Sequence, residues 1–168
     1  MKTNSLRSEI NRIKNHPLCK ISRNIVIGEG NKKAKIMIIG QNPGEEEDKT
    51  GRPFVGKSGK FLNKVLEKNK IKRESLYITN VVNCKTPENR KPTKKEIEFF
   101  MPLLLKQISM IKPKIIILLG DVAWHVPRIK GIKYFEIYHP AAAMRFAKFR
   151  KRFESDFKKL KIYRNDRT

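Results

Sequence analysis

The chain has 168 residues, and its 39 Lys and Arg against 16 Asp and Glu give a formal net charge of +23. This length is typical of one domain, so we expect residues 1–168 to share a single hydrophobic core. The charge favours a polyanionic partner, nucleic acid before an anionic membrane. The apolar runs stay short of the roughly 20 residues that cross a bilayer, and the polar N-terminus lacks the apolar centre of a signal peptide.

Apolar spacing and turn residues predict the secondary structure in chain order. A short amphipathic helix is expected over about residues 4–15, and a fully apolar strand over 35–39. A loop with Gly and Pro fills residues 40–56, before a helix over about 58–69 and a strand over 76–80. The second half predicts a basic loop (84–92), a helix capped by Thr93 (93–110), a strand (114–119), a short helix near residue 121, a strand (134–138) and a basic helix (143–160).

Strands that alternate with helices indicate a parallel sheet covered on both faces. We therefore predict an α/β fold, a three-layer α/β/α sandwich with a central four-stranded parallel sheet. Polar side chains follow three of its strands: Gln41 and Asn42 after the first, Asn80 at the end of the second and His139 after the last. Since ligands of open α/β sheets bind at the carboxyl ends of the strands, these residues are candidates for one pocket.

Three motifs carry a resemblance to a known family. The segment GQNPGEEED (40–48), followed by GRPFVG (51–56), is similar to the first motif of family 4 of the uracil-DNA glycosylase superfamily. The segment LYITNVV (76–82) resembles the uracil-reading strand of that family, and YHPAAA (138–143) resembles its last motif. Joint agreement of three spaced motifs is far more specific than any one of them.

The resemblance implies an enzyme of base excision repair that flips uracil out of DNA and hydrolyses its N-glycosidic bond. By this resemblance Asn80 would bind the N3–H and O4 of uracil, Phe54 would stack on the ring, and His139 would donate a hydrogen bond to O2. Glu47 would crowd the methyl group of thymine, and Gly40 and Gly44 complete the expected substrate-binding set. The enzyme would be monofunctional, without lyase activity.

The first motif departs from family 4, which usually has Glu where this chain has Gln41 and a small residue where it has Asn42. Asn at the latter position resembles the mismatch-specific and single-strand-selective branches, which use it to place a water. We predict that catalysis depends on water positioned by Asn42, with Gln41 beside it and no carboxylate base. Hypoxanthine, xanthine or mismatched uracil remain alternative substrates, and a catalytically weakened uracil- or DNA-binding protein is a second alternative.

A second departure concerns metal. Family 4 enzymes carry an iron–sulfur cluster on four cysteines, and the corresponding positions here are Ile13, His16, Cys84 and Phe100. A site of His16, Cys19 and Cys84 would lack a fourth ligand, so we expect no cluster and no metal. The two cysteines make no disulfide framework, which favours reduced thiols and a cytoplasmic or DNA-associated location.

Basic residues near the motifs are candidates for phosphate contacts, which supply affinity without sequence information. Met144 is the candidate for the wedge that fills the gap left by the flipped base, as the resemblance implies. We expect the protein to act as a monomer on uracil-containing DNA. The predicted phosphate contacts are Arg145, Lys148, Arg150, Lys85 and Arg90.

Overall fold

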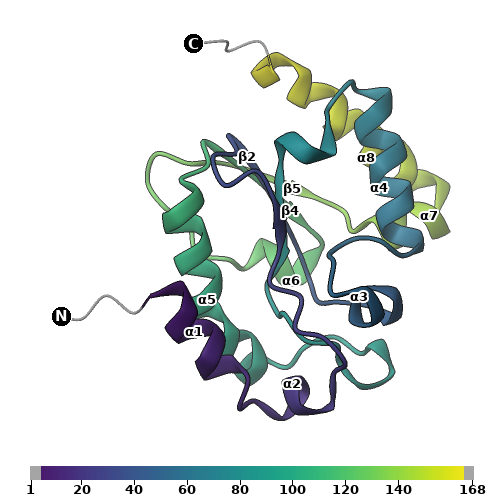
Figure 1. Ribbon diagram of the computed structural model, residues 1–168. Helices are drawn as coiled ribbons and strands as arrows, with labels where there is room; N and C mark the ends of the chain where they lie inside the picture. Colours follow the sequence, from purple (N-terminus) through teal and green to yellow (C-terminus); the bar gives the residue numbers. More distant parts are fainter. Residues whose placement is uncertain (1–4, 165–168) are drawn as a thin grey trace.

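Five strands form the sheet at the centre of the molecule, in the order β1-β3-β2-β4-β5 (Figure 1). The computed structural model describes residues 5–164. The strands are β1 (Glu29–Gly30), β2 (Ile36–Gly40), β3 (Tyr77–Asn80), β4 (Ile115–Leu119) and β5 (Lys133–Ile137). The four longer strands are parallel, whereas β1 pairs antiparallel with β3. The α/β prediction is confirmed; the expected four strands omit β1, which is too short to show a periodic pattern.

Helices cover both faces of this sheet (Figure 1). On one face lie α1 (Leu6–Ile13), α2 (Pro17–Ile21) and α5 (Lys94–Ile111), and on the other lie α4 (Lys57–Lys68), α7 (Pro140–Arg145) and α8 (Ala147–Lys159). Two short helices, α3 (Glu45–Thr50) and α6 (Asp121–Trp124), follow β2 and β4 directly. The short 3-10 turns span Arg73–Ser75, Pro87–Asn89 and Leu160–Arg164.

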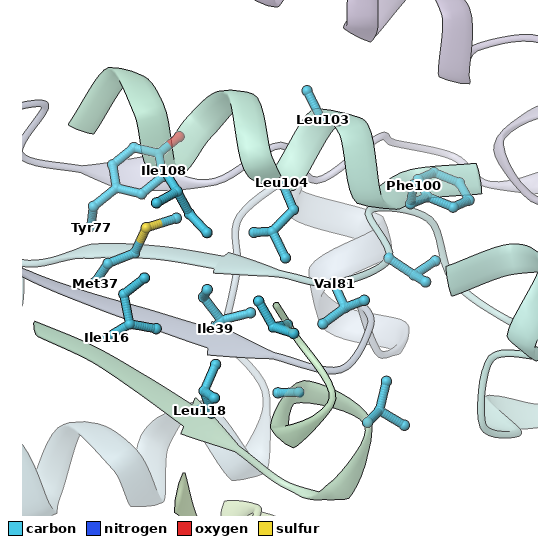
Figure 2. Close-up of a cluster of buried hydrophobic side chains, with 14 of the residues drawn as sticks. Met37, Ile39, Tyr77, Val81, Phe100, Leu103, Leu104, Ile108, Ile116 and Leu118 are labelled. Atoms are coloured by element: carbon cyan, nitrogen blue, oxygen red, sulfur yellow. The ribbon is translucent and has the colours of Figure 1, made fainter. Parts of the chain in front are cut away.

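Alternate side chains of the buried strands pack against opposite helical layers. Met37 and Ile39 belong to the apolar cluster beneath α5, while Ile38 between them belongs to the cluster beneath α4 and α8. Figure 2 shows Leu104 and Ile108 of α5 facing Met37, Ile39 and the neighbouring strands. This alternation explains why β2 and β4 are apolar at every position, since both of their faces are buried.

Three expected elements differ in detail. The loop over 40–56 contains α3, whose four acidic residues Glu45–Asp48 occupy the first turn, where negative charge is favourable. The basic helix over 143–160 is two helices, α7 and α8, separated by Phe146 in an extended conformation. The predicted first helix begins at residue 4, which lies outside the described residues. Between residues 5 and 164 no helix is long and apolar enough to cross a membrane.

The expectation of reduced thiols is wrong for this structure. Cys19 and Cys84 form a disulfide between α2 and the segment after β3, with their Cα atoms 5.3 Å apart. Both cysteines are buried in the cluster beneath α5. The bond closes a separation of 65 residues, and the fold alone brings the two segments together.

Candidate functional site

An open cleft of about 1210 Å³ lies at the carboxyl ends of the parallel strands. Its lining includes Gln41 and Asn42 after β2, Asn80 at the end of β3, Gly120 after β4 and His139 after β5. Glu47, Gly44 and Phe54 line it as well. The structure therefore brings the three polar strand ends into a single cleft, and Gly40 lies beside it in register with Asn80.

Asn80 presents its amide at the bottom of this cleft. The residue is 3% exposed, and its side chain makes no hydrogen bond to another residue of the described chain. A side chain on Gly40 would collide with the Phe54 ring and with Oδ1 of Asn80, so only glycine allows this close approach. Because Asn80 lines the cleft and its amide has no partner within the described chain, the amide is available to a ligand that offers both a donor and an acceptor.

The Phe54 ring is fixed by its backbone. Phe54 has φ +49°, in the left-handed region that residues other than glycine rarely adopt. Arg73 holds this conformation, because its guanidinium donates to the carbonyls of Pro53 at 2.6 Å and Phe54 at 3.1 Å. The same group also donates to Asn63 and pairs with Glu29. The ring centroids of Phe54 and His139 are 6.1 Å apart across the cleft.

Glu47 ties together two parts of the loop between β2 and α4. Its carboxylate accepts from the N–H groups of Val55 at 2.9 Å, Gly56 at 2.8 Å and Gly44 at 3.2 Å. The residue is 9% exposed and lines the cleft. Hydrogen bonds to an ionised carboxylate are stronger than neutral ones, so Glu47 organises the loop that carries Phe54.

His139 is a neutral hydrogen-bond donor. As the N-cap of α7 it accepts the N–H of Ala141 on Nδ1 at 3.1 Å, so the neutral ring carries its proton on Nε2. Burial lowers the pKa of His139 to about 4, although Asp121 and Glu47 oppose the shift. Gly120, with φ +88°, lies against the imidazole side chain, and a Cβ there would come within 3.1 Å of the Cβ of His139.

The Asn42 amide has a defined orientation. Its Nδ2 donates to the carbonyl of Pro43 at 3.1 Å and to Oγ1 of Thr86 at 3.3 Å. The Thr86 hydroxyl donates its own proton to the carbonyl of Arg90 at 2.6 Å, so towards Asn42 it can only accept. The NH₂ group of Asn42 therefore faces Thr86, and its Oδ1 remains as an acceptor in the cleft. Gln41 lines the cleft beside it.

The predicted phosphate contacts differ in what they touch. Arg145 lines the cleft, and Lys148 is exposed. Arg150 donates to the carbonyls of Ala143 and Met144 at the end of α7. Lys85 pairs with Glu45, and Arg90 forms a bidentate pair with Glu96, whose pKa falls to about 2 chiefly through that contact. Their roles on DNA stay predictions, and the two paired groups must exchange partners to bind phosphate.

The positions that a cluster would require are occupied by other groups. Ile13 and Phe100 are fully buried, and the His16 ring packs against Phe99 and Phe100. Cys84 is bonded to Cys19. Within residues 5–164, no three His, Cys, Asp or Glu side chains are grouped so that they could hold a metal.

Sequence reasoning missed three residues at this site. Arg73 and Thr86 act through hydrogen bonds to residues far along the chain, and no local pattern reveals such pairs. Phe146 lines the cleft and is 51% exposed, whereas the candidate wedge Met144 is 36% exposed but is not among the residues that line the cleft. The sequence predicts one continuous helix over residues 143–160, so no local signal marked Phe146 as the extended residue between α7 and α8.

Comparisons with known proteins identify the family of this chain. Residues 27–161 match the model of the uracil DNA glycosylase superfamily, so the chain belongs to that family. A type-4 uracil-DNA glycosylase of Archaeoglobus fulgidus is 39% identical over 85% of this chain and 83% of its own length. One of Saccharolobus solfataricus is 39% identical over 93% and 83% respectively, and one of Thermotoga maritima is 49% identical over 64% and 56%.

The lowered pKa of His139 predicts a pH dependence of stability. In the unfolded chain His139 becomes protonated below about pH 6.5, whereas in the folded protein it becomes protonated only near pH 4. The free energy of unfolding should therefore fall as the pH is lowered from about 6.5 to about 4. Denaturation of the native protein and of His139→Gln across this window measures the difference. Equal slopes, or an NMR titration of His139 near 6.5, would contradict the assignment.

Arg73 should contribute more to stability than its neighbour Arg52, which pairs with the same Glu29. Arg73→Met removes the donors to two carbonyls and an amide, and we expect a loss of about 2–3 kcal/mol in the free energy of unfolding. Arg52 is 61% exposed, so Arg52→Met should cost less than about 1 kcal/mol. Urea unfolding of both variants tests this. Equal losses in the free energy of unfolding would mean that Arg73 contributes only through its ion pair with Glu29.

Proposed function

We propose that the protein is a monofunctional DNA glycosylase that hydrolyses the N-glycosidic bond of deoxyuridine in DNA. One observation carries the proposal: the unpartnered amide of Asn80, the Phe54 ring and the neutral imidazole of His139 line one cleft. Membership of the uracil DNA glycosylase superfamily supports it, as do relatives that are named type-4 uracil-DNA glycosylases.

Base selection follows from the amide of Asn80. Its Oδ1 can accept the N3–H of uracil while its Nδ2 donates to O4, and cytosine presents the opposite pattern at this edge. Phe54 supplies a flat apolar surface for the flipped ring. Glu47, which borders the same cleft, restricts the space beside C5, and its three backbone contacts keep it there.

Bond cleavage leaves the electron pair of the C1′–N1 bond on the uracil and positive charge on the sugar. His139 donates from Nε2 to uracil O2 as negative charge develops there. A neutral donor suits this role, because it is ready at neutral pH without a protonation step. Hydrogen bonding to the leaving base lowers the barrier to heterolysis.

Water completes the reaction by attacking C1′. Asn42 accepts a hydrogen bond from this water on Oδ1 and aims its oxygen at the sugar, and the released proton passes to solvent or to the departing base. Neither Asn42 nor Gln41 can hold that proton. An oxocarbenium-like centre needs only a well-placed weak nucleophile, so positioning by the Asn42 amide suffices.

An iron–sulfur cluster does not fit the residues present. The disulfide of Cys84 with Cys19 and the apolar packing of Ile13 and Phe100 leave no set of thiolates. We propose that these contacts join α2, α5 and the segment after β3 without metal. Uracil-containing DNA is the proposed partner, and we expect a monomer that is cytoplasmic or associated with nucleoid or nuclear DNA.

The first experiment measures strand cleavage after alkali of end-labelled oligonucleotides with one uracil, single-stranded or opposite guanine or adenine. Hypoxanthine and thymine serve as control bases, and the protein is treated with a chelator beforehand. Alkali-dependent cleavage at uracil, reduced at least about 100-fold in Asn42→Ala, is the expected result.

Each other result has a defined meaning. Activity on hypoxanthine alone would assign the protein to another branch of the superfamily. Strand cleavage without alkali would indicate lyase activity, with Lys57 or Lys91, which line the cleft, as the amine nucleophile. If the protein bound DNA but cleaved none of the substrates, it would be a DNA-binding protein rather than an enzyme. Loss of activity with iron removal would contradict the metal-free site.

Thr86 should act as a positioning residue for Asn42. Thr86→Val removes the acceptor for the Asn42 NH₂ group, so kcat should fall roughly tenfold while KM changes little. Thr86→Ser keeps the hydroxyl and should restore kcat. In an Asn42→Ala background the valine substitution should have no further effect on kcat. An additive loss would show that Thr86 does not act through Asn42.

A further inference from the structure

A second cleft, of about 850 Å³, lies at the opposite edge of the sheet from the catalytic cleft. Its walls come from the amino ends of β2, β3, β4 and β5, from the segment after α4 and from the last 3-10 turn. Six exposed lysines line it, and we call it the lysine cleft: Lys33, Lys35, Lys70, Lys72, Lys114 and Lys133.

The lysine cleft is more positive than the catalytic cleft. Among the described residues, the lining of the lysine cleft contains no Asp or Glu, whereas the lining of the catalytic cleft contains four acidic residues, Glu45, Glu46, Glu47 and Asp121. Lys33, Lys72 and Lys114 form no ion pair with any residue between 5 and 164. A hollow lined by charge of one sign concentrates the field of those charges, so this surface attracts an anionic ligand.

The floor of the lysine cleft is aliphatic. It is formed by Ile71, Leu76, Ile115 and Leu160, with Ile36 at its side. Apolar atoms at the bottom and ammonium groups at the rim suit a ligand that combines carboxylates with aliphatic side chains. The ammonium groups can stay hydrated while the lysine stems extend the apolar surface.

Other polar groups of the lysine cleft are already engaged. Oδ1 of Asn31 accepts the N–H of Lys33, and the Ser75 hydroxyl donates to the carbonyl of Lys72. Tyr163 supplies the aromatic ring, but Lys133 lies 4.3 Å from its centroid and Phe135 packs on it. The base-stacking platforms and base-edge contacts typical of nucleic-acid grooves are therefore missing from the described lining.

We propose that the lysine cleft binds an acidic peptide segment with aliphatic side chains, presented by a partner protein. Carboxylates of the segment would meet the lysine rim, and its aliphatic side chains would cover the floor. Because the two clefts lie at opposite edges of the sheet, the partner would leave the catalytic cleft open to DNA.

The test uses a fluorescent peptide that alternates Glu and Leu, with polyglutamate of equal charge and oligothymidylate as competitors. Lys33→Glu/Lys72→Glu/Lys114→Glu is compared with Lys60→Glu/Lys64→Glu/Lys158→Glu, a variant with the same net charge and changes on exposed lysines of α4 and α8. Fluorescence anisotropy gives the peptide affinity, and circular dichroism verifies that both variants fold.

We expect saturable binding of the Glu–Leu peptide, weakened at least about tenfold in the lysine-cleft variant and much less in the control variant. Cleavage of deoxyuridine oligonucleotides should change less in the lysine-cleft variant than peptide binding does. Equal losses of peptide affinity in both variants would assign binding to net charge and overturn the proposal. If polyglutamate bound with the same affinity as the Glu–Leu peptide, the aliphatic floor would have no role in binding. If oligothymidylate bound more tightly than the peptide and the lysine-cleft substitutions weakened that binding, the cleft would be a nucleic-acid site.

Discussion

Parallel pairing of β2 with β3 and β4, and of β4 with β5, carries four strand ends to one edge of the sheet. Asn42, Asn80 and His139 of the catalytic cleft lie at or just after three of these ends. The pairing is stable because helices cover both faces of β2 and β4, so the apolar side chains on both faces of these strands are buried away from water. A register shift of one residue between β2 and β3 would separate Gly40 from Asn80 and close the space beside the amide.

The sheet places the strand ends, but hydrogen bonds from side chains to the backbone shape the loops between them. Glu47 accepts hydrogen bonds from three backbone N–H groups, and Thr86 accepts one from the Asn42 amide. Arg73 donates to the carbonyls of Pro53 and Phe54 and so holds the backbone conformation of Phe54. These contacts hold the groups of the cleft in place before substrate arrives. A preorganised site spends less of its binding free energy on ordering, which suits the proposed reaction, in which a base must also be unstacked.

Positive charge is unevenly distributed over the two clefts. The catalytic cleft mixes basic and acidic groups, and some of its bases are paired, as Lys91 is with Asp121. In the part of the chain that the structure describes, the charged residues that line the lysine cleft are all lysines. The net charge of +23 therefore favours long-range attraction to polyanions, and part of it is concentrated in the lysine cleft, away from the proposed contacts to DNA.

The layered α/β fold and the residues after the strands could be predicted from the sequence, because apolar periodicity and polar strand ends are local features. The sequence also located Asn42, Asn80, Phe54 and His139 through their motifs. It could not give the disulfide, since 65 residues separate Cys19 and Cys84, nor the positions of Arg73 and Thr86 beside the site. Tertiary structure decided these, because hydrogen bonds and covalent links between distant segments depend on packing, which no local pattern encodes.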